Sequence, residues 1–134
     1  MPEITQAKLK DVNLRMAIRS IYNCTRFAPK RARVIAKMCK RLDQEFLDTD
    51  RQYDLLIEEF AERDEKGNVV QAEGGRPGSF NIIPDKVNDF EEKIEAMNIV
   101  NVDISSDIMF GMDDLELVGM LSPAQVEALE PFIQ

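Results

Sequence analysis

The sequence has no histidine and no tryptophan, and its only cysteines are Cys24 and Cys39. Without histidine it lacks the commonest general base, and no Ser-His or Cys-His pair is available for nucleophilic catalysis. Two cysteines are too few for a disulfide scaffold, and their spacing matches no zinc motif. We therefore expect reduced thiols in a non-enzymatic protein with no catalytic residues, no metal site and no cofactor.

Long apolar runs are also missing. No run approaches the roughly 18–20 residues that cross a bilayer, and residues 1–5 lack the basic stretch and apolar core of a signal peptide. Apolar residues make up 44% and charged residues 31% of the 134 residues, which is typical of a folded domain and too apolar for disorder. We therefore expect one domain, residues 1–134, in the cytoplasm and without membrane contact.

The charge, in contrast, is divided very unevenly along the chain. Residues 1–41 contain eleven Lys or Arg and two acids, a net +9, whereas residues 42–134 contain six bases and twenty-three acids, a net −17; together they give −8. Such an asymmetry indicates an electrostatic partner or head-to-tail self-association. The alternative is that the two regions neutralise each other inside one fold.

Two helices are predicted in the first half of the chain. Thr5 can cap a first helix over residues 6–22, in which Leu9, Val12 and Met16 recur at spacings of three and four. A second, unusually long helix is predicted over residues 29–66, which contain no glycine and no proline after Pro29. Its apolar face forms a coiled-coil-like seam with a period near 3.5 residues. The seam residues are Ile35, Met38, Leu42, Phe46, Thr49, Tyr53, Leu56 and Phe60.

We expect the first helix to pack on the basic beginning of the long helix, and a later helix to pack on its acidic end. Gly67 is available to end the long helix. Residues 69–71 and 80–82 then flank a glycine-rich turn over residues 72–79, a pattern typical of a β-hairpin. A helix beginning near Pro84 and a strand over residues 100–104 follow, and the strand is expected to join the hairpin.

The last part of the chain predicts short helices. Residues 107–121 are apolar and ambiguous, whereas Ser122 and Gln125 form a capping box with Pro123 at the first helical position. The predicted fold is therefore mainly α, of the α+β class. Residues 5–66 form a basic-then-acidic helical hairpin, and residues 67–134 form a subregion with a two- or three-stranded β element and short C-terminal helices.

A basic row is the first candidate for partner binding. On one helical face its members recur at steps of four and three: Arg26, Lys30, Arg33, Lys37 and Lys40. Such a row can neutralise several phosphates, with a steep salt dependence. Only Phe27 lies close enough to act as an interleaved aromatic, so nothing indicates base stacking. An acidic patch on a protein partner and a plain solvated face remain the alternatives.

An acidic stripe is the second candidate. It runs at helical steps of seven, four, four and four through Asp43, Asp50, Asp54, Glu58 and Glu62. Like charges four residues apart cost about 0.2–0.5 kcal/mol per pair, so the arrangement does not serve helix stability. Neighbouring carboxylates lie about 6 Å apart, which is similar to the phosphate spacing of a nucleic-acid strand. The stripe is therefore either a DNA-mimicking surface or an ordinary solvated face.

Several segments resemble a loose class of small phage-encoded proteins of uncharacterised function. The shared pattern is a helical hairpin with an acidic end at residues 53–60, a turn at residues 63–68 that contains Gly67 and Asn68, a helix carrying Phe90, and a strand at residues 100–104. The class has no established active site. The resemblance implies a viral setting and a non-enzymatic role.

Our leading hypothesis is a phage-encoded interaction protein that acts in virion structure or assembly by protein–protein docking. The seam and a Met/Phe surface would supply apolar contact, and the partner would be the protein itself or other particle proteins. The Met/Phe surface consists of Met109, Met112 and Met120 near Phe110. The alternative is a host-directed accessory protein. It would bind nucleic acid through the basic row, or mimic DNA through the acidic stripe to inhibit a host defence or nucleic-acid enzyme. Either protein would act in the cytoplasm of an infected bacterium, and the first could also enter the virion.

Overall fold

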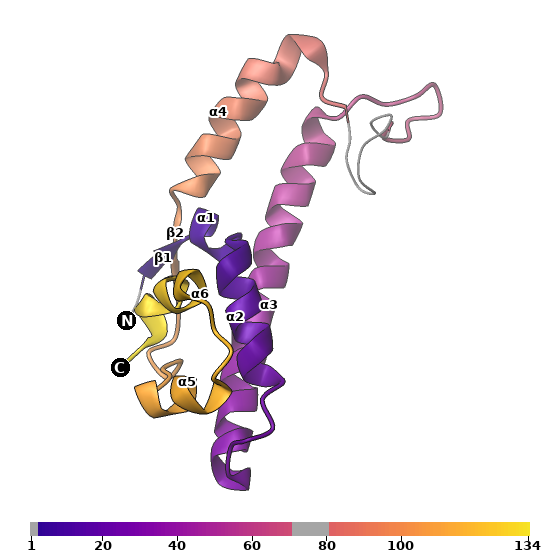
Figure 1. Ribbon diagram of the computed structural model, residues 1–134. Coiled ribbons are helices and arrows are strands. Elements are labelled where there is room, and N and C mark those ends of the chain that lie inside the picture. The colour runs from indigo at the N-terminus through magenta and orange to yellow at the C-terminus, as the bar shows by residue number, and fades with distance from the viewer. Residues whose placement is uncertain (1–2, 71–80) are drawn as a thin grey trace.

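The computed structural model describes residues 3–70 and 81–134, and the fold is mainly helical, as predicted (Figure 1). In chain order the elements are β1 (Glu3–Thr5), α1 (Gln6–Leu9), α2 (Val12–Tyr22), α3 (Pro29–Phe60), the 3-10 helix η1 (Pro84–Lys86), α4 (Val87–Asn98), β2 (Asn101–Asp103), α5 (Met112–Val118), α6 (Pro123–Ala128) and the 3-10 helix η2 (Glu130–Phe132). The long α3 extends along most of the molecule; α2 and α4 pack against it, and α5 and α6 pack against α2.

Helix α3 follows from its sequence. Ala28 is extended, Pro29 occupies the first helical turn, and 32 residues without an interior glycine or proline give a length of about 48 Å. All eight predicted seam residues are buried. The predicted end at residue 66 is wrong, because Ala61 turns into extended backbone and pairs with Ile82. Gly67, with φ +82°, instead closes a tight turn on Asp64.

The predicted first helix is interrupted. Helix α1 ends at Leu9, and Asp11 starts α2, because its carboxylate accepts a hydrogen bond of 2.8 Å from the backbone N–H of Asn13. The new phase of α2 buries the set Leu14, Ala17, Ile18 and Ile21. Val12 and Met16, which the sequence pattern places beside Leu9 on the apolar face, are 63% and 49% exposed. Only Leu9 of that trio is buried.

The helices that pack on α3 follow the predicted order. Helix α2 covers its basic half and α4 covers its acidic half (Figure 1). The main core joins α2, the basic half of α3 and the C-terminal segment, with Leu42, Phe110 and Phe132 fully buried. At the acidic end the rings of Phe60 and Phe90 lie 5.8 Å apart. The seam is therefore filled within one chain, and the prediction that it contacts a partner is wrong.

The small sheet differs from the prediction. Residues 101–103 do form a strand, and β2 pairs in antiparallel register with β1, with Ile4 opposite Val102, a pairing that the sequence did not predict. Residues 71–80, with most of the predicted hairpin, lie outside the described part of the chain. The flanks that are described bind the segment after α3: Val70 donates to the carbonyl of Glu62 at 2.8 Å, and Glu62 donates to that of Asn81 at 2.7 Å.

The C-terminal segment closes the main core. The ambiguous residues 107–121 contain α5, and the Ser122–Gln125 capping box is present at the start of α6, as predicted. Helix α6 ends at Ala128, and Pro131 lies inside the 3-10 helix η2 that follows it. Phe110 donates to the carbonyl of Phe132 and accepts from Gln134, which places the end of the chain against the core.

Candidate interaction surface

A second row of residues follows α3 on the side away from the buried seam. Its positions recur at alternating steps of three and four, as the seam positions do, and every one of them is exposed. We call this set the outer row: Lys30, Arg33, Lys37, Lys40, Gln44, Leu47, Arg51, Asp54 and Glu58. A 3.5-residue period keeps such a row on one face of a helix, and 28 residue steps correspond to about 42 Å. The outer row is therefore a continuous exposed surface along most of α3.

Charge changes sign along the outer row. Its first four members are basic and its last two are acidic, with Gln44, Leu47 and Arg51 between them. Leu47 is 62% exposed, and the nearby Leu55 is 59% exposed. The surface thus combines a basic end, a centre with exposed leucine, and an acidic end.

The basic row is brought together only in part. Lys30, Arg33, Lys37 and Lys40 lie on α3, are exposed, and make no ion pair within the described residues. Arg26 precedes α3, and its guanidinium lies beside the backbone of Gly119, which ends α5 in the left-handed conformation. Four of the five predicted residues therefore form one surface.

Other basic residues of the same helix are neutralised inside the fold. Arg31 donates from Nε to Oδ1 of Asp114 at 3.0 Å and makes a second bond to the other carboxylate oxygen. Arg31 holds the pKa of Asp114 below its ordinary value, and the N–H of Gly111 adds a bond of 2.8 Å. Arg41 lies 3.8 Å from the exposed carboxylate of Asp107. Internal neutralisation thus accounts for part of the charge asymmetry.

The acidic stripe is divided by the structure. Asp54 and Glu58 lie in the outer row, and Asp43 is exposed near its centre. Asp50 turns towards α1 and α2, and Glu62 lies beyond the end of α3. The regular carboxylate spacing on which DNA mimicry depends is therefore absent from this face.

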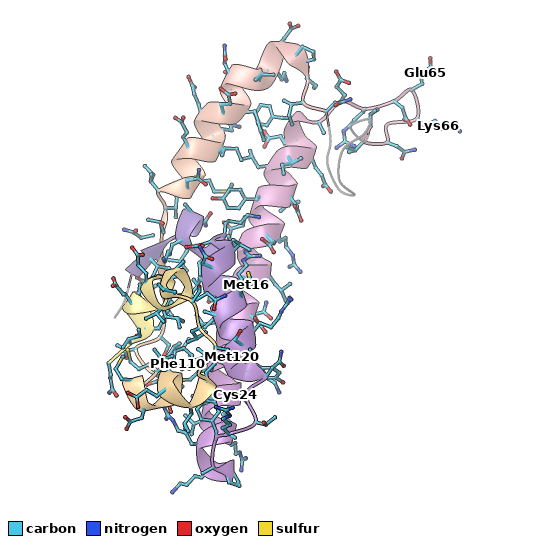
Figure 2. The ribbon with its side chains drawn as sticks, viewed as in Figure 1. Met16, Cys24, Glu65, Lys66, Phe110 and Met120 are labelled. Carbon is cyan, nitrogen blue, oxygen red and sulfur yellow. The ribbon has the colours of Figure 1, made fainter. Side chains whose placement is uncertain are left out.

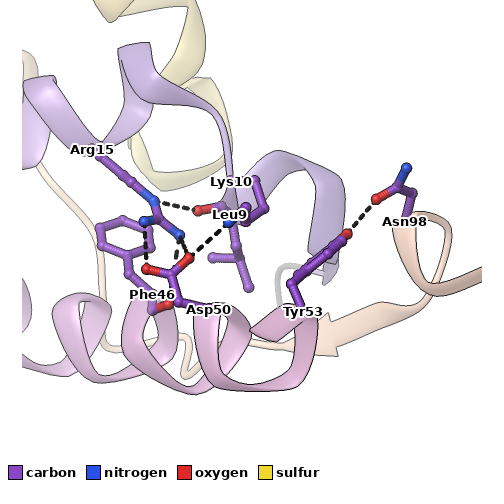
Figure 3. Close-up of polar contacts among 7 residues, drawn as sticks. All are labelled: Leu9, Lys10, Arg15, Phe46, Asp50, Tyr53 and Asn98. Carbon is purple, nitrogen blue, oxygen red and sulfur yellow. Dashed lines mark hydrogen bonds and ion pairs between the residues drawn. The ribbon is translucent and has the colours of Figure 1, made fainter. Parts of the chain in front are cut away.

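Asp50 holds α1, α2 and α3 together (Figure 3). It accepts from Arg15 Nη1 and Nη2 at 2.8 and 2.9 Å and from Lys10 Nζ at 3.0 Å. The hydrogen bonds from Arg15 are the main reason that the pKa of Asp50 lies below its ordinary value. The same guanidinium lies 5.1 Å from the ring of Phe46, and its Nε donates to the carbonyl of Leu9 at 2.8 Å. Asp50 is therefore structural.

A groove borders the centre of the outer row. It lies between α2 and α3, has a volume of about 490 Å³, and includes Tyr22, Phe46 and Leu47 in its lining. Arg19 and Asp43 stand at the same groove. Leu47 therefore connects the exposed face of α3 to a hollow that is lined by both apolar and charged side chains.

The predicted Met/Phe surface is present only in part (Figure 2). Met112 is 51% and Met120 87% exposed, but Phe110 is fully buried in the core. A second hollow of about 480 Å³ lies beside Met120, with Arg19 and Cys24 in its lining. Exposed methionine can adapt to a partner, but this surface lacks the aromatic residue that the sequence pattern assigns to it.

The described residues hold no group of three or more Cys, Asp or Glu side chains placed to bind a metal ion. Asp114, near the C-terminus, pairs with Arg31. Burial raises the pKa of the Cys39 thiol to about 12, which leaves it protonated at neutral pH and unsuited to nucleophilic attack.

The centre of the outer row is not among the predicted site residues. Gln44, Leu47 and Arg51 continue the spacing of the basic row and join it to Asp54 and Glu58. The signal was available, because a second 3.5-residue repeat parallel to the seam is visible in the numbering alone. The change of sign hides this repeat, because the basic and the acidic residues each look like a separate feature of the sequence.

Comparisons with known proteins identify no relative. No protein-family model matches the chain, and neither a curated protein nor a solved structure shows significant similarity to it. Within the part of the chain that the structure describes, no helix has both the length and the apolar character to span a membrane.

Proposed function

We propose that the protein is a non-enzymatic interaction protein that acts in phage virion structure or assembly by protein–protein docking. The observation that supports the docking function is the outer row. It is exposed along about 42 Å of α3, and it is basic at one end and acidic at the other. The resemblance to small phage-encoded proteins supports the viral setting. The partners proposed are the protein itself and other particle proteins, in the cytoplasm of an infected bacterium or in the virion.

Docking through this row follows from its physical character. Opposed charges fix the orientation and register of a partner more than they add affinity. Leu47 and the adjoining groove supply apolar area that a partner can cover. A partner with the complementary charge order would therefore be selected over one of uniform charge.

Nucleic-acid binding is the second candidate, and one observation favours it. Lys30, Arg33, Lys37 and Lys40 are exposed and form no ion pair with any other described residue, which suits an anionic partner. However, Asp54 and Glu58 stand on the same helix face and would repel a nucleic-acid strand that followed the row. A protein partner therefore agrees better with the whole surface.

Tagged capture from the producing cells, with mass spectrometry at a low and a moderate salt concentration, tests the proposal. The wild-type chain is compared with Lys37→Glu/Lys40→Glu and with the matched control Lys66→Glu/Lys86→Glu, which makes the same charge change at exposed positions away from α3. We expect the wild type and the control to recover particle proteins or the protein itself, and the outer-row variant to lose them. Recovery of a host nuclease, a polymerase or nucleic acid in their place would contradict the assembly role.

A further inference from the structure

We infer that the partner of the outer row is a second copy of this chain, docked antiparallel along α3 with Leu47 on the two-fold axis. The inference rests on the proposed function, because it names the partner of the same surface. No part of residues 3–70 or 81–134 covers the row, and its basic half complements its acidic half, so one copy carries both sides of the contact.

The register follows from the numbering. In an antiparallel helix pair with a two-fold axis, residues equally far before and after the axis lie opposite each other. Lys40 precedes Leu47 by seven residues, and Asp54 follows it by seven. Lys37 precedes it by ten and Glu58 follows it by eleven, so this pair is also opposed. Each contact occurs twice in the dimer, which gives four pairs of opposite charge.

The centre of the same register is also compatible. Leu47 meets the Leu47 of the other copy, and Gln44 lies opposite Arg51, so the carbonyl of the amide can accept from the guanidinium. The exposed Leu55 falls beside Lys40, whose aliphatic stem can cover it.

Other arrangements of two copies bring like charges together. A parallel pair places Lys37 and Lys40 opposite themselves, and Glu58 opposite itself. An antiparallel pair centred on Gln44 places Lys37 opposite Arg51. Like charges at such separations repel, so the register centred on Leu47 is the one that the outer row favours.

One helix face buries less area than the roughly 1,200–2,000 Å² of a stable interface. We therefore expect a weak dimer that dissociates as salt screens the exposed charge pairs. The full chain should show a concentration-dependent mass between monomer and dimer by light scattering or sedimentation at low salt. Its association should weaken about tenfold or more at high salt.

Charge reversal tests which surface is used. Lys37→Glu/Lys40→Glu and Asp54→Lys/Glu58→Lys should each be monomeric, because each opposes like charges at both ends of the contact. An equimolar mixture of the two should dimerise again, since the reversed basic end of one copy then meets the reversed acidic end of the other. Combining all four changes in one chain should also restore the dimer. Lys66→Glu/Lys86→Glu should dimerise as the wild type does.

Disulfide trapping tests the register. In a Cys24→Ser background, Leu47→Cys should form a linked dimer on mild oxidation, because only a residue near the axis meets its own copy. Leu55→Cys is the matched control, because its parent side chain is similarly exposed but faces Lys40. Equal linking at both positions would overturn the register.

The inference and the proposed function fail separately. A wild-type chain that stays monomeric at hundreds of micromolar in low salt overturns self-docking. So does a dimer that both charge reversals leave unchanged. Loss of captured particle proteins in Lys37→Glu/Lys40→Glu would still support the proposed docking surface in the first of these cases.

Discussion

At the scale of single residues, Asp50 shows how ion pairing can give an acidic residue a structural role. It belongs to the acidic stripe by spacing, yet Arg15 and Lys10 enclose it between three helices. The sequence could not reveal this, because Asp50 and Asp54 lie four residues apart in one acidic stripe, and this spacing does not show which carboxylate meets another helix. Only the interruption at Asp11 sets the phase of α2 that brings Arg15 to this position.

The Asp50→Asn variant should lower the free energy of unfolding by about 1–2 kcal/mol at neutral pH, because it replaces charge-assisted hydrogen bonds of a partly exposed carboxylate. The pKa of Asp50 is lower in the folded protein than its ordinary value of 3.8. Its contribution to the free energy of unfolding is therefore complete when the pH is above 3.8, and it is lost as the pH falls through the lowered pKa. Urea titrations at neutral and strongly acidic pH should therefore show the difference from wild type shrinking on acidification.

Asp54→Asn is the control for this prediction, because Asp54 is exposed and has no ion pair in the described residues. It should leave neutral-pH stability within about 0.5 kcal/mol of wild type. A pH-independent deficit in Asp50→Asn would mean that packing, and not the carboxylate charge, connects α1, α2 and α3.

At the scale of elements, α3 carries two parallel repeats: the seam, which is buried, and the outer row, which is exposed. The apolar seam was predictable in full, since eight positions at alternating steps of three and four are buried in the structure. The end of α3 was not predictable, because it depends on the pairing of Ala61 with Ile82, which is distant in sequence. The pairing of β1 with β2 was not predictable either. The two strands are distant in sequence, and three residues are too few to show a strand pattern.

The two repeats make a direct comparison possible. Leu42→Asp places a carboxylate in the main core, where the wild-type side chain is fully buried, and should cost more than about 4 kcal/mol. Leu47→Asp makes the same change on the outer row and should leave the unfolding free energy of the monomer within about 0.5 kcal/mol. Thermal melts at low protein concentration measure both. Wild-type stability in Leu42→Asp would refute the assignment of the buried face.

At the scale of the whole molecule, the charge asymmetry has two components. Pairs such as Arg31–Asp114 and Lys10–Asp50 neutralise the basic and acidic regions across the fold, whereas the outer row keeps both signs exposed on one helix. The sequence alone could not separate them, because a charge count contains no information about which side chains face inward. The charged residues of the candidate surface were therefore predicted, but their connection into one continuous surface along α3 was not.

The molecule also has an uneven distribution of packing, which predicts uneven stability. Tyr53, Leu56 and Phe60 lie outside the main core cluster, and α4, which covers them, has no fully buried residue. We expect the acidic end to open locally at a lower free energy than the main core. In native-state hydrogen exchange, Phe60→Ala should reduce protection in α4 and the last turns of α3 by about 2–4 kcal/mol, while the amides around Leu42 and Ile18 keep their protection. Equal loss at both ends would show that the chain opens as one cooperative unit.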